Sequence, residues 1–284
     1  YLSLALWLES DRMGWLIPAL TEKKISNQKD VVRNERRQSY ELQPYGEANL
    51  WLYENLFPEG HPYHVPTIGR HEDIQNANME DVKEFFATWY VPNNASLVIC
   101  GDFDPNVAKE LVQKYFGEIP KGAQPSPRIN ATAELTEEKV IRKQKAVPHS
   151  KVWLAWISPA LFAPGDAELD ILSDLLTGGK DGLLYQKLVN EKQIAKDISA
   201  YQSSSLLHGQ FFIQATAAEG HTTDELVKEI DAILTSFKET TPDEEKVSIA
   251  KFNWESRYYG SLQTIAAKAN RLNSYNVYTG DPGY

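Results

Sequence analysis

The stretch DISAYQSSSLLHGQFFIQATA, residues 197–217, decides the fold class. Its last part alternates apolar and polar side chains, with Phe211, Ile213 and Ala215 on one side, which is typical of a half-buried β-strand. Residues 197–204 form a second strand-like run, and only a short loop separates the two runs. Two strands joined by a short loop favour antiparallel pairing. We therefore expect an antiparallel or mixed sheet rather than a doubly wound parallel one.

Further strand-like and helical segments surround this pair in the second half of the sequence. Apolar runs with β-branched and aromatic residues predict two more strands before it. A capping box, formed by Thr222 and by Glu225 three residues later, opens a helix after it. The expected elements are strands at 140–146 and 151–158, helices at about 166–177, 182–192 and 222–238, and a long final helix from about 241.

The first half of the sequence shows a similar mixture of helices and one strand. The spacing of apolar residues predicts a helix over 25–42. ASLVICGDF, residues 95–103, predicts a strand. Asp104 followed by Pro105 is the usual start of a helix, and we expect that helix to run to Phe116. Other expected elements are a helix at about 46–56, a loop at 57–70 and a helix at 80–89.

A linker separates these two halves. GEIPKGAQPSPR, residues 117–128, holds three prolines and two glycines, which is typical of a connecting segment. We expect two consecutive domains, 1–122 and 139–284, joined by a linker at 123–138. Each domain is expected to be α+β, with a mixed, mainly antiparallel sheet packed with helices. Both chain ends look cut, so we expect a fragment of a longer protein, with the second domain truncated at its C-terminus.

Composition excludes several classes of function. The 284 residues carry a net charge of −10, which argues against nucleic acid or an anionic membrane surface as the main partner. No apolar run approaches the ~20 residues of a membrane span. The single cysteine, Cys100, excludes an internal disulfide and fits the cytoplasm and the periplasm equally, so the compartment stays unknown.

The densest group of histidines lies in one predicted loop. His61 and His64 are followed by His71, and histidines at such spacing can bind a transition metal. No cysteine or carboxylate completes an obvious ligand set there, so we favour a loop without a metal. The sequence contains no H-E-x-x-H or H-x-x-E-H motif and no G-x-S-x-G motif.

The segment KDVVRNERRQSYE, residues 29–41, places a carboxylate at an unusual position. Glu35 falls at helical spacing from the two valines of this segment and from Leu42, so it should lie on the inward, apolar face of the predicted helix. Burying an ionised carboxylate is costly unless a cation or metal compensates it. Two interpretations stay open at this point: a partly exposed Glu35 paired with Arg36 or the arginine after it, or a metal ligand.

Several stretches, taken in order, resemble a known family. They cover nearly the whole chain, and the ordered set is more specific than any single motif. The set resembles the later part of the first domain of M16-family zinc peptidases, the insulinase or pitrilysin-like family that also includes mitochondrial processing peptidases. LLTGGKDGLLYQKLVNEKQIA (175–195) and the long final helix resemble the family's second, non-zinc domain. The stretches that match the first domain are LALWLESDRMG (4–14), QKDVVRNERRQSYE (28–41), HPYHVPTIGRHEDI (61–74) and DVKEFFATWYVPNNASLVICGDFDP (81–105).

The resemblance implies a zinc site to which this chain contributes one residue. The family binds zinc with the two histidines of an H-x-x-E-H motif and a Glu on a later helix, and the Glu of the motif is the general base. The position of the later Glu matches Glu35. Because the motif itself is absent, the zinc site is incomplete in this chain, and we expect no peptide hydrolysis by the chain alone.

Three other positions depart from the family pattern. Val189 and Lys196 occupy the places where many second-type domains carry an Arg and a Tyr that help to hold substrate, and Gln28 stands where some relatives carry a second acid. The resemblance implies part of a zinc-dependent endopeptidase that cleaves peptides or unfolded segments. It also implies a second M16 half, in the same parent chain or in a partner subunit. The alternatives are a non-catalytic homologue that serves as a structural or partner subunit, and a metal-free peptide-binding module.

Overall fold

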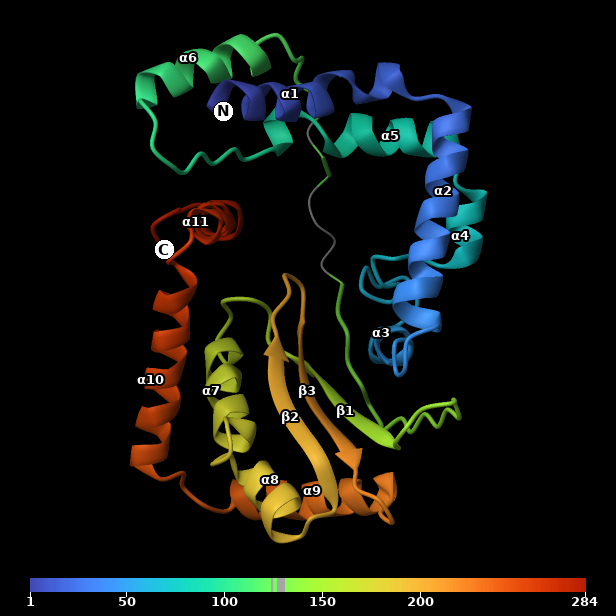
Figure 1. Cartoon of the computed structure of the whole chain (residues 1–284), viewed down its shortest axis with the longest axis vertical. Helices are drawn as coiled ribbons and strands as arrows, with labels where there is room; N and C mark the ends of the chain where they lie inside the picture. Colours follow the sequence, from blue (N-terminus) through green and yellow to red (C-terminus); the bar gives the residue numbers. More distant parts are fainter. Residues whose placement is uncertain (124, 127–130) are drawn as a thin grey trace. The chain divides into compact units, whose positions relative to one another are not determined.

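The computed structural model describes residues 1–123, 125–126 and 131–284. They divide into two compact units, and each is assembled from segments that are far apart in the sequence (Figure 1). The domains expected from the sequence, 1–122 and 139–284 with a linker at 123–138, are consecutive segments, unlike these two units. That division into domains stays a prediction. Residues 124 and 127–130 of the expected linker lie outside the described residues. Unit 1 consists of Tyr1–Arg36, Ile68–Ile129 and Tyr258–Tyr284, and unit 2 consists of Arg37–Thr67 and Asn130–Arg257.

Unit 2 contains a three-stranded antiparallel sheet in the order β1-β3-β2. The strands are β1 (Lys151–Ser158), β2 (Ala195–Ser203) and β3 (Gly209–Ala217). The pairing of β2 with β3 confirms the antiparallel pair expected from residues 197–217. The fold is therefore α+β, with helices around a small antiparallel sheet.

Helices cover both faces of this sheet. On one face, Ile213 and Ala215 of β3 are fully buried in the main core. That core is closed by α7 (Asp166–Thr177), α8 (Leu183–Tyr185) and α9 (Thr223–Lys238), at the positions predicted for helices. On the other face, Phe212 packs against Phe57, which follows α3 (Ala48–Leu56). The alternation of β3 side chains thus divides two apolar clusters between the faces.

The remaining elements of unit 2 are short, apart from one long helix. The helix predicted at 182–192 begins as α8 and continues as a π-helical turn. The predicted long final helix is divided in two, because residues 262–264 separate α10 (Glu244–Ser261) from α11 (Ile265–Thr279). The elements are the π-helical turns η1 (Arg37–Glu41) and η3 (Gln186–Glu191), and α10 (Glu244–Ser261), whose last residues belong to unit 1.

In its described part, unit 1 is built from helices. Leu6 and Ala108 are buried where α1 (Leu2–Ala19) lies along α6 (Pro105–Phe116). The start of α6 confirms the predicted cap, since the Asp104 carboxylate accepts hydrogen bonds from the amides of Asn106 at 2.7 Å and Val107 at 3.2 Å. No helix of the described residues is long and apolar enough to cross a membrane. The elements are α1 (Leu2–Ala19), α2 (Glu22–Arg36), α4 (His71–Asn76), α5 (Met79–Trp89), the 3₁₀ turn η2 (Pro92–Asn94), α6 (Pro105–Phe116) and α11 (Ile265–Thr279).

Two predicted strands are wrong. Residues 95–103 and 140–146 have a strand-like composition but form neither strand nor helix. A β-strand requires a partner for its backbone groups, and within the described residues β1, β2 and β3 pair only with one another. Composition reports the tendency of a segment to form a strand, but not whether a partner lies beside it.

Candidate functional site

Helix α2 presents Glu35 near its C-terminal end. The opposite flank of the helix is fixed to unit 1, where Ile25 is buried. The Lys29 ammonium donates to two backbone carbonyls of the 69–77 segment, and the Arg36 guanidinium donates to a third. These bonds hold the helix axis, and therefore the position of Glu35, relative to the rest of unit 1.

The prediction that Glu35 points inward is wrong. Glu35 is exposed, and Val31 and Leu42, expected on the same buried face, are 55% and 68% exposed. The inward face of α2 instead passes through residues 25, 29, 32 and 36, which recur at helical spacing. Position 42 does not continue that face, because α2 ends at Arg36 and Leu42 belongs to unit 2. The spacing of the apolar residues thus indicates the exposed side of the helix and not its buried side.

The ion pair considered for Glu35 is also not formed. Its carboxylate makes no hydrogen bond or ion pair with any described residue, whereas the neighbouring Arg36 guanidinium donates a hydrogen bond to the Gly69 carbonyl. Within the same described residues, no three His, Cys, Asp or Glu side chains converge to hold a metal ion. The assignment of Glu35 as a zinc ligand stays a prediction.

The histidine loop packs its first histidine into unit 2. His61 is 6% exposed and stacks on Phe57 with ring centroids 4.7 Å apart. Its Nδ1 accepts a hydrogen bond from the Tyr63 amide at 3.0 Å, whereas Nε2 is enclosed without a partner among the described residues. Burial lowers the pKa of His61, and His208, whose ring centroid is 5.5 Å away, lowers it further. The ring is thus held in its neutral form as part of a packed cluster.

The other residues singled out in the sequence are dispersed. His71 is the first residue of α4 in unit 1, whereas His61 and His64 belong to unit 2. Val189 is half-buried against the main core. The Lys196 ammonium lies 2.8 Å from Nε2 of His149.

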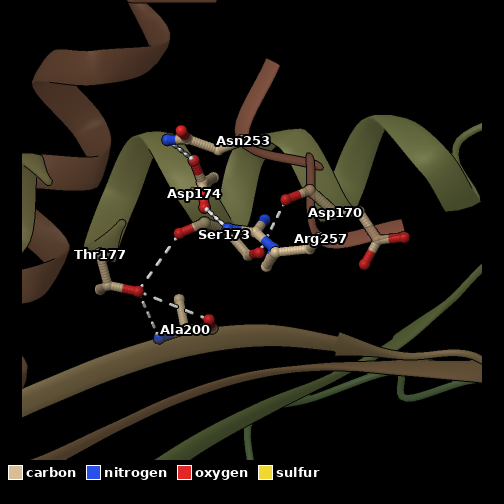
Figure 2. Close-up of polar contacts among 7 residues, drawn as sticks. All are labelled: Asp170, Ser173, Asp174, Thr177, Ala200, Asn253 and Arg257. Carbon is tan, nitrogen blue, oxygen red and sulfur yellow. Dashed lines mark hydrogen bonds and ion pairs between the residues drawn. The ribbon is translucent and has the colours of Figure 1, made fainter. Parts of the chain in front are cut away.

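Three aspartates at four-residue spacing form a row along α7. Asp174 is held from α10: its carboxylate accepts a hydrogen bond from the side-chain amide of Asn253 at 3.2 Å and one from the Arg257 guanidinium at 3.0 Å (Figure 2). Asp170 lies one turn before Asp174, and Asp166 lies one turn before that. The row therefore has a cationic partner at one end, and it joins α7 to α10.

The middle aspartate of this row has an altered acidity. Burial raises the pKa of Asp170 to about 6, Asp166 adds to the rise, and Arg257 opposes it. Asp166 itself is buried and accepts hydrogen bonds from Ser204 at 2.6 Å and Gln202 at 3.0 Å. A neighbouring carboxylate in a partly buried site disfavours the ionised form of Asp170. Asp170 thus ionises at a higher pH than a solvated aspartate, although it is still mostly ionised at neutral pH.

The last residue of α7 binds the edge of the sheet. The Thr177 hydroxyl accepts a hydrogen bond from the Ala200 amide at 2.8 Å and donates to the Ser173 carbonyl at 3.2 Å (Figure 2). Because β2 is an edge strand, this amide would otherwise lack a partner in the ladder.

Unit 2 also contains a cavity of about 660 Å³. It is lined by residues of the segments 41–52, 139–153 and 223–227, all of which belong to this unit. Aromatic rings form part of its wall: those of Tyr45 and Trp153 are 5.8 Å apart. A cavity of this size, with both apolar and polar walls, is typical of a binding site.

Three lysines lie over the aromatic wall of the cavity, among them Lys145, whose ammonium is 5.8 Å from the ring centre of Trp51. The Lys151 ammonium lies 5.4 Å from the ring centre of Trp153 and 5.7 Å from that of Tyr45, and the Lys143 ammonium lies 5.3 Å from that of Trp51. Such cation–π contacts are favourable and leave ammonium N–H groups available for a further partner. Sequence reasoning missed these residues, although the repeated cations of KVIRKQKAV (139–147) carried a signal.

A family comparison accounts for this combination of helices and sheet. A model described as the peptidase M16 inactive domain matches residues 76–253, which is more than half of the chain. The chain belongs to the M16 peptidase family. The resemblance inferred from the sequence is thereby confirmed.

Individual relatives agree with this M16 assignment. The chain is 28% identical to the zinc protease PqqE of Helicobacter pylori, over 97% of this chain and 62% of that protein. It is 21% identical to the uncharacterized zinc protease YmxG of Bacillus subtilis, over 88% of this chain and 59% of that protein. The chain thus spans about three-fifths of the length of these curated relatives.

Solved structures show the same fold. The crystal structure of a protease from Helicobacter pylori matches with a TM-score of 0.87 and 26% identity, over 99% of this chain and 67% of that one. A structure described as the peptidase M16 inactive domain from Pseudomonas fluorescens matches with a TM-score of 0.78 and 18% identity, over 99% of this chain and 65% of that one. The second match, at this low identity, supports the fold only.

Proposed function

We propose that this M16 chain is part of a zinc-dependent endopeptidase that cleaves peptides or unfolded segments. In this proposal the chain alone is inactive and contributes Glu35 as one zinc ligand. The proposal is supported by membership of the family and by the relatives that are named zinc proteases.

The state of Glu35 is the observation that carries this proposal. Its carboxylate is exposed and unpaired among the described residues, and Lys29 and Arg36 fix its helix from the other flank. A ligand with no partner loses no existing hydrogen bond when it binds a metal. A fixed helix also reduces the ordering that binding requires.

The remaining ligands belong to sequence outside this chain. The chain lacks H-x-x-E-H and spans about three-fifths of its curated relatives. We expect the full-length protein to supply two histidines and the general base from that further sequence. The partner that completes the enzyme is a second M16 half, either in the same parent chain or in a separate subunit.

A second candidate function is favoured by the type of family match. The matched model is described as the inactive domain, and this description fits a non-catalytic M16 homologue that acts as a structural or peptide-binding partner subunit. In that case Glu35 binds no metal. The two candidates therefore differ in the zinc content of the full-length protein.

The test compares two variants of the full-length protein, Glu35→Gln and Asp30→Asn. Asp30 is an exposed carboxylate on the same helix, so its variant removes an equal charge at a matched position. We expect Glu35→Gln to lower zinc affinity about 100-fold, because removal of a group that only supports a ligand already costs 10–100-fold. Cleavage of an unfolded peptide should fall in parallel, and Asp30→Asn should keep both.

Thermal unfolding completes the comparison, because Glu35 has no structural partner to lose. Without zinc, both variants should unfold within about 0.5 kcal/mol of the parent. If the full-length parent holds no zinc and cleaves no unfolded peptide when zinc is supplied, the partner-subunit function holds instead. If the full-length parent binds zinc and Glu35→Gln does not lower its zinc affinity, Glu35 is not a ligand.

A further inference from the structure

We propose that the cavity of unit 2 binds an extended peptide segment that carries acidic side chains next to apolar ones. This site involves neither Glu35 nor zinc, so the inference does not depend on the peptidase function proposed above. Three properties of the cavity support it: the aromatic wall, the unpaired cations and the unpaired backbone.

The aromatic wall is suited to apolar side chains. Tyr45, Trp51 and Trp153 line a volume of about 660 Å³, within the usual range for ligand sites of about 300–1,000 Å³. The Tyr45 hydroxyl donates to the His149 carbonyl at 2.7 Å and accepts from the His149 amide at 3.2 Å. These two bonds tie the Tyr45 ring to a segment that is distant in the sequence, so this part of the wall is ordered before a ligand binds.

Tyr45 also has an uncommon backbone conformation. Its φ of 62° lies in the left-handed region, which few residues other than glycine adopt. The two hydrogen bonds with His149 hold it there. Strain of this kind is found preferentially at functional sites, and here it orients a ring into the cavity wall.

The charges of the cavity select an anionic ligand. Five Lys or Arg side chains and three Glu or Asp side chains line it, although the whole chain has a net charge of −10. Arg142 pairs with Asp224, and Lys145 pairs with Glu47. Lys143 and Lys151 have no carboxylate partner among the described residues, and each lies over an aromatic ring. These two ammonium groups can bind carboxylates of a ligand that contacts the rings below them.

The backbone around the cavity favours a peptide over a small anion. β1 is an edge strand, and its residues 151–153 line the cavity with one edge that pairs with no described strand. The facing segment 139–147 makes one backbone–backbone hydrogen bond within the described residues, from the Val147 amide to the Lys145 carbonyl. Unpaired edge groups are the usual attachment site for an added peptide strand. Because side chains of a strand alternate, an added strand would place every second residue towards the rings.

Binding of labelled peptides to the 284-residue chain tests this inference. The probe is a short fluorescein-labelled peptide of alternating Val and Glu, and the comparison peptide has Lys in place of Glu. Fluorescence anisotropy is measured at low salt with a metal chelator present. We expect the Glu peptide to bind about tenfold or more tightly than the Lys peptide, because hydrogen bonds to charged groups are worth about 1.5–3 kcal/mol. Equal binding of the two peptides would overturn the inference.

Two double variants locate the site. Lys143→Gln with Lys151→Gln removes the unpaired cations of the cavity, and Lys180→Gln with Lys246→Gln removes two exposed cations elsewhere in unit 2. The first pair should weaken binding of the Glu peptide about tenfold, and the second should leave it within about twofold. An equal loss in both would show that only the total charge matters, and would overturn the inference. Circular dichroism verifies that each variant is folded.

The role of the backbone is tested with the same probe. Methylation of alternate peptide amides removes the donors that a strand needs, so we expect it to abolish binding. Free glutamate at the same concentration should not displace the probe. If the methylated peptide binds normally, or glutamate displaces the probe, the cavity is an anion site only and the peptide assignment is wrong.

Discussion

Replacement of Asp170 by asparagine should stabilise unit 2 at neutral pH. The ionised form of Asp170 is disfavoured in the folded chain by burial and by Asp166, and Arg257 compensates only in part. An asparagine has a similar shape and no charge, so Asp170→Asn removes the unfavourable ionisation. The change is made on α7, next to the bonds that join Asp174 to α10.

The size of the expected stabilisation follows from the shift in the pKa of Asp170. The pKa of Asp170 rises from its ordinary value of 3.8 to about 6. Each pKa unit corresponds to about 1.4 kcal/mol, so the full shift would be about 3 kcal/mol. Asp170 is only half-buried, and solvent screening reduces this figure to about 1 kcal/mol. A gain of that size raises the melting temperature of a domain of this size by about 2–4 °C.

The direction depends on pH. The folded chain holds the Asp170 proton more tightly than the unfolded chain, so the stability linked to this group is present at low pH. It is lost as the pH rises from about 4 to about 6. Asp170→Asn should therefore raise the melting temperature above pH 6, and the difference from the parent chain should shrink towards pH 4.

Melting temperatures of three chains, measured at several pH values between 4 and 8, provide the assay. The control is Asp231→Asn, an exposed carboxylate on α9, which should change the melting temperature little at any pH. The reasoning is refuted if Asp170→Asn lowers the melting temperature at pH 7.5, because the attraction to Arg257 would then outweigh burial and repulsion.

Three further predictions concern the packing of unit 2. Thr177→Val should cost about 1–3 kcal/mol in urea unfolding, because it leaves the Ala200 amide without its acceptor, while Thr177→Ser should restore most of that loss. Phe57→Ala, at a side chain that is 1% exposed, should cost about 3–5 kcal/mol, and a loss below about 1 kcal/mol would show that the site collapses around the cavity. Burial and His208 lower the pKa of His61, so the stability that the neutral ring provides is present above its ordinary pKa of 6.5 and is lost as the pH falls below that value. His61→Phe should remove this part of the pH dependence of the melting temperature. An unchanged pH profile in the variant would contradict the assignment.

Local signals predicted the helices and the central strands well. The Asp104–Pro105 start of α6 depends on hydrogen bonds within three residues, so the sequence contains everything that forms it. The alternation in 209–217 survives because both faces of β3 are packed, one against the main core and one against Phe57. Interactions between neighbours in sequence, or along one strand, are visible in the pattern itself.

Structural features that depend on contacts between distant segments could not be predicted from the sequence. Residues 95–103 have the composition of a strand, but whether they pair is decided elsewhere in the chain. The side of α2 that faces inward is decided by the bonds of Lys29 and Arg36 to the 69–77 segment, which a hydrophobic period does not report. The cavity likewise combines three separate segments, so Tyr45 and Lys151 could not be placed together in advance.

The interleaving of the two units sets an order for their formation during synthesis. All segments of unit 2 in this chain precede residue 258, whereas unit 1 also includes residues 258–284. The ribosome adds about 5–20 residues per second, so the helices of unit 1 made before residue 129 wait roughly 8–30 s for residues 258–284. During that interval a chaperone can reach apolar side chains of unit 1 while unit 2 is already folding. A nascent chain held with residue 257 just outside the ribosome should therefore be protease-resistant in unit 2 and still sensitive in the segments that build unit 1.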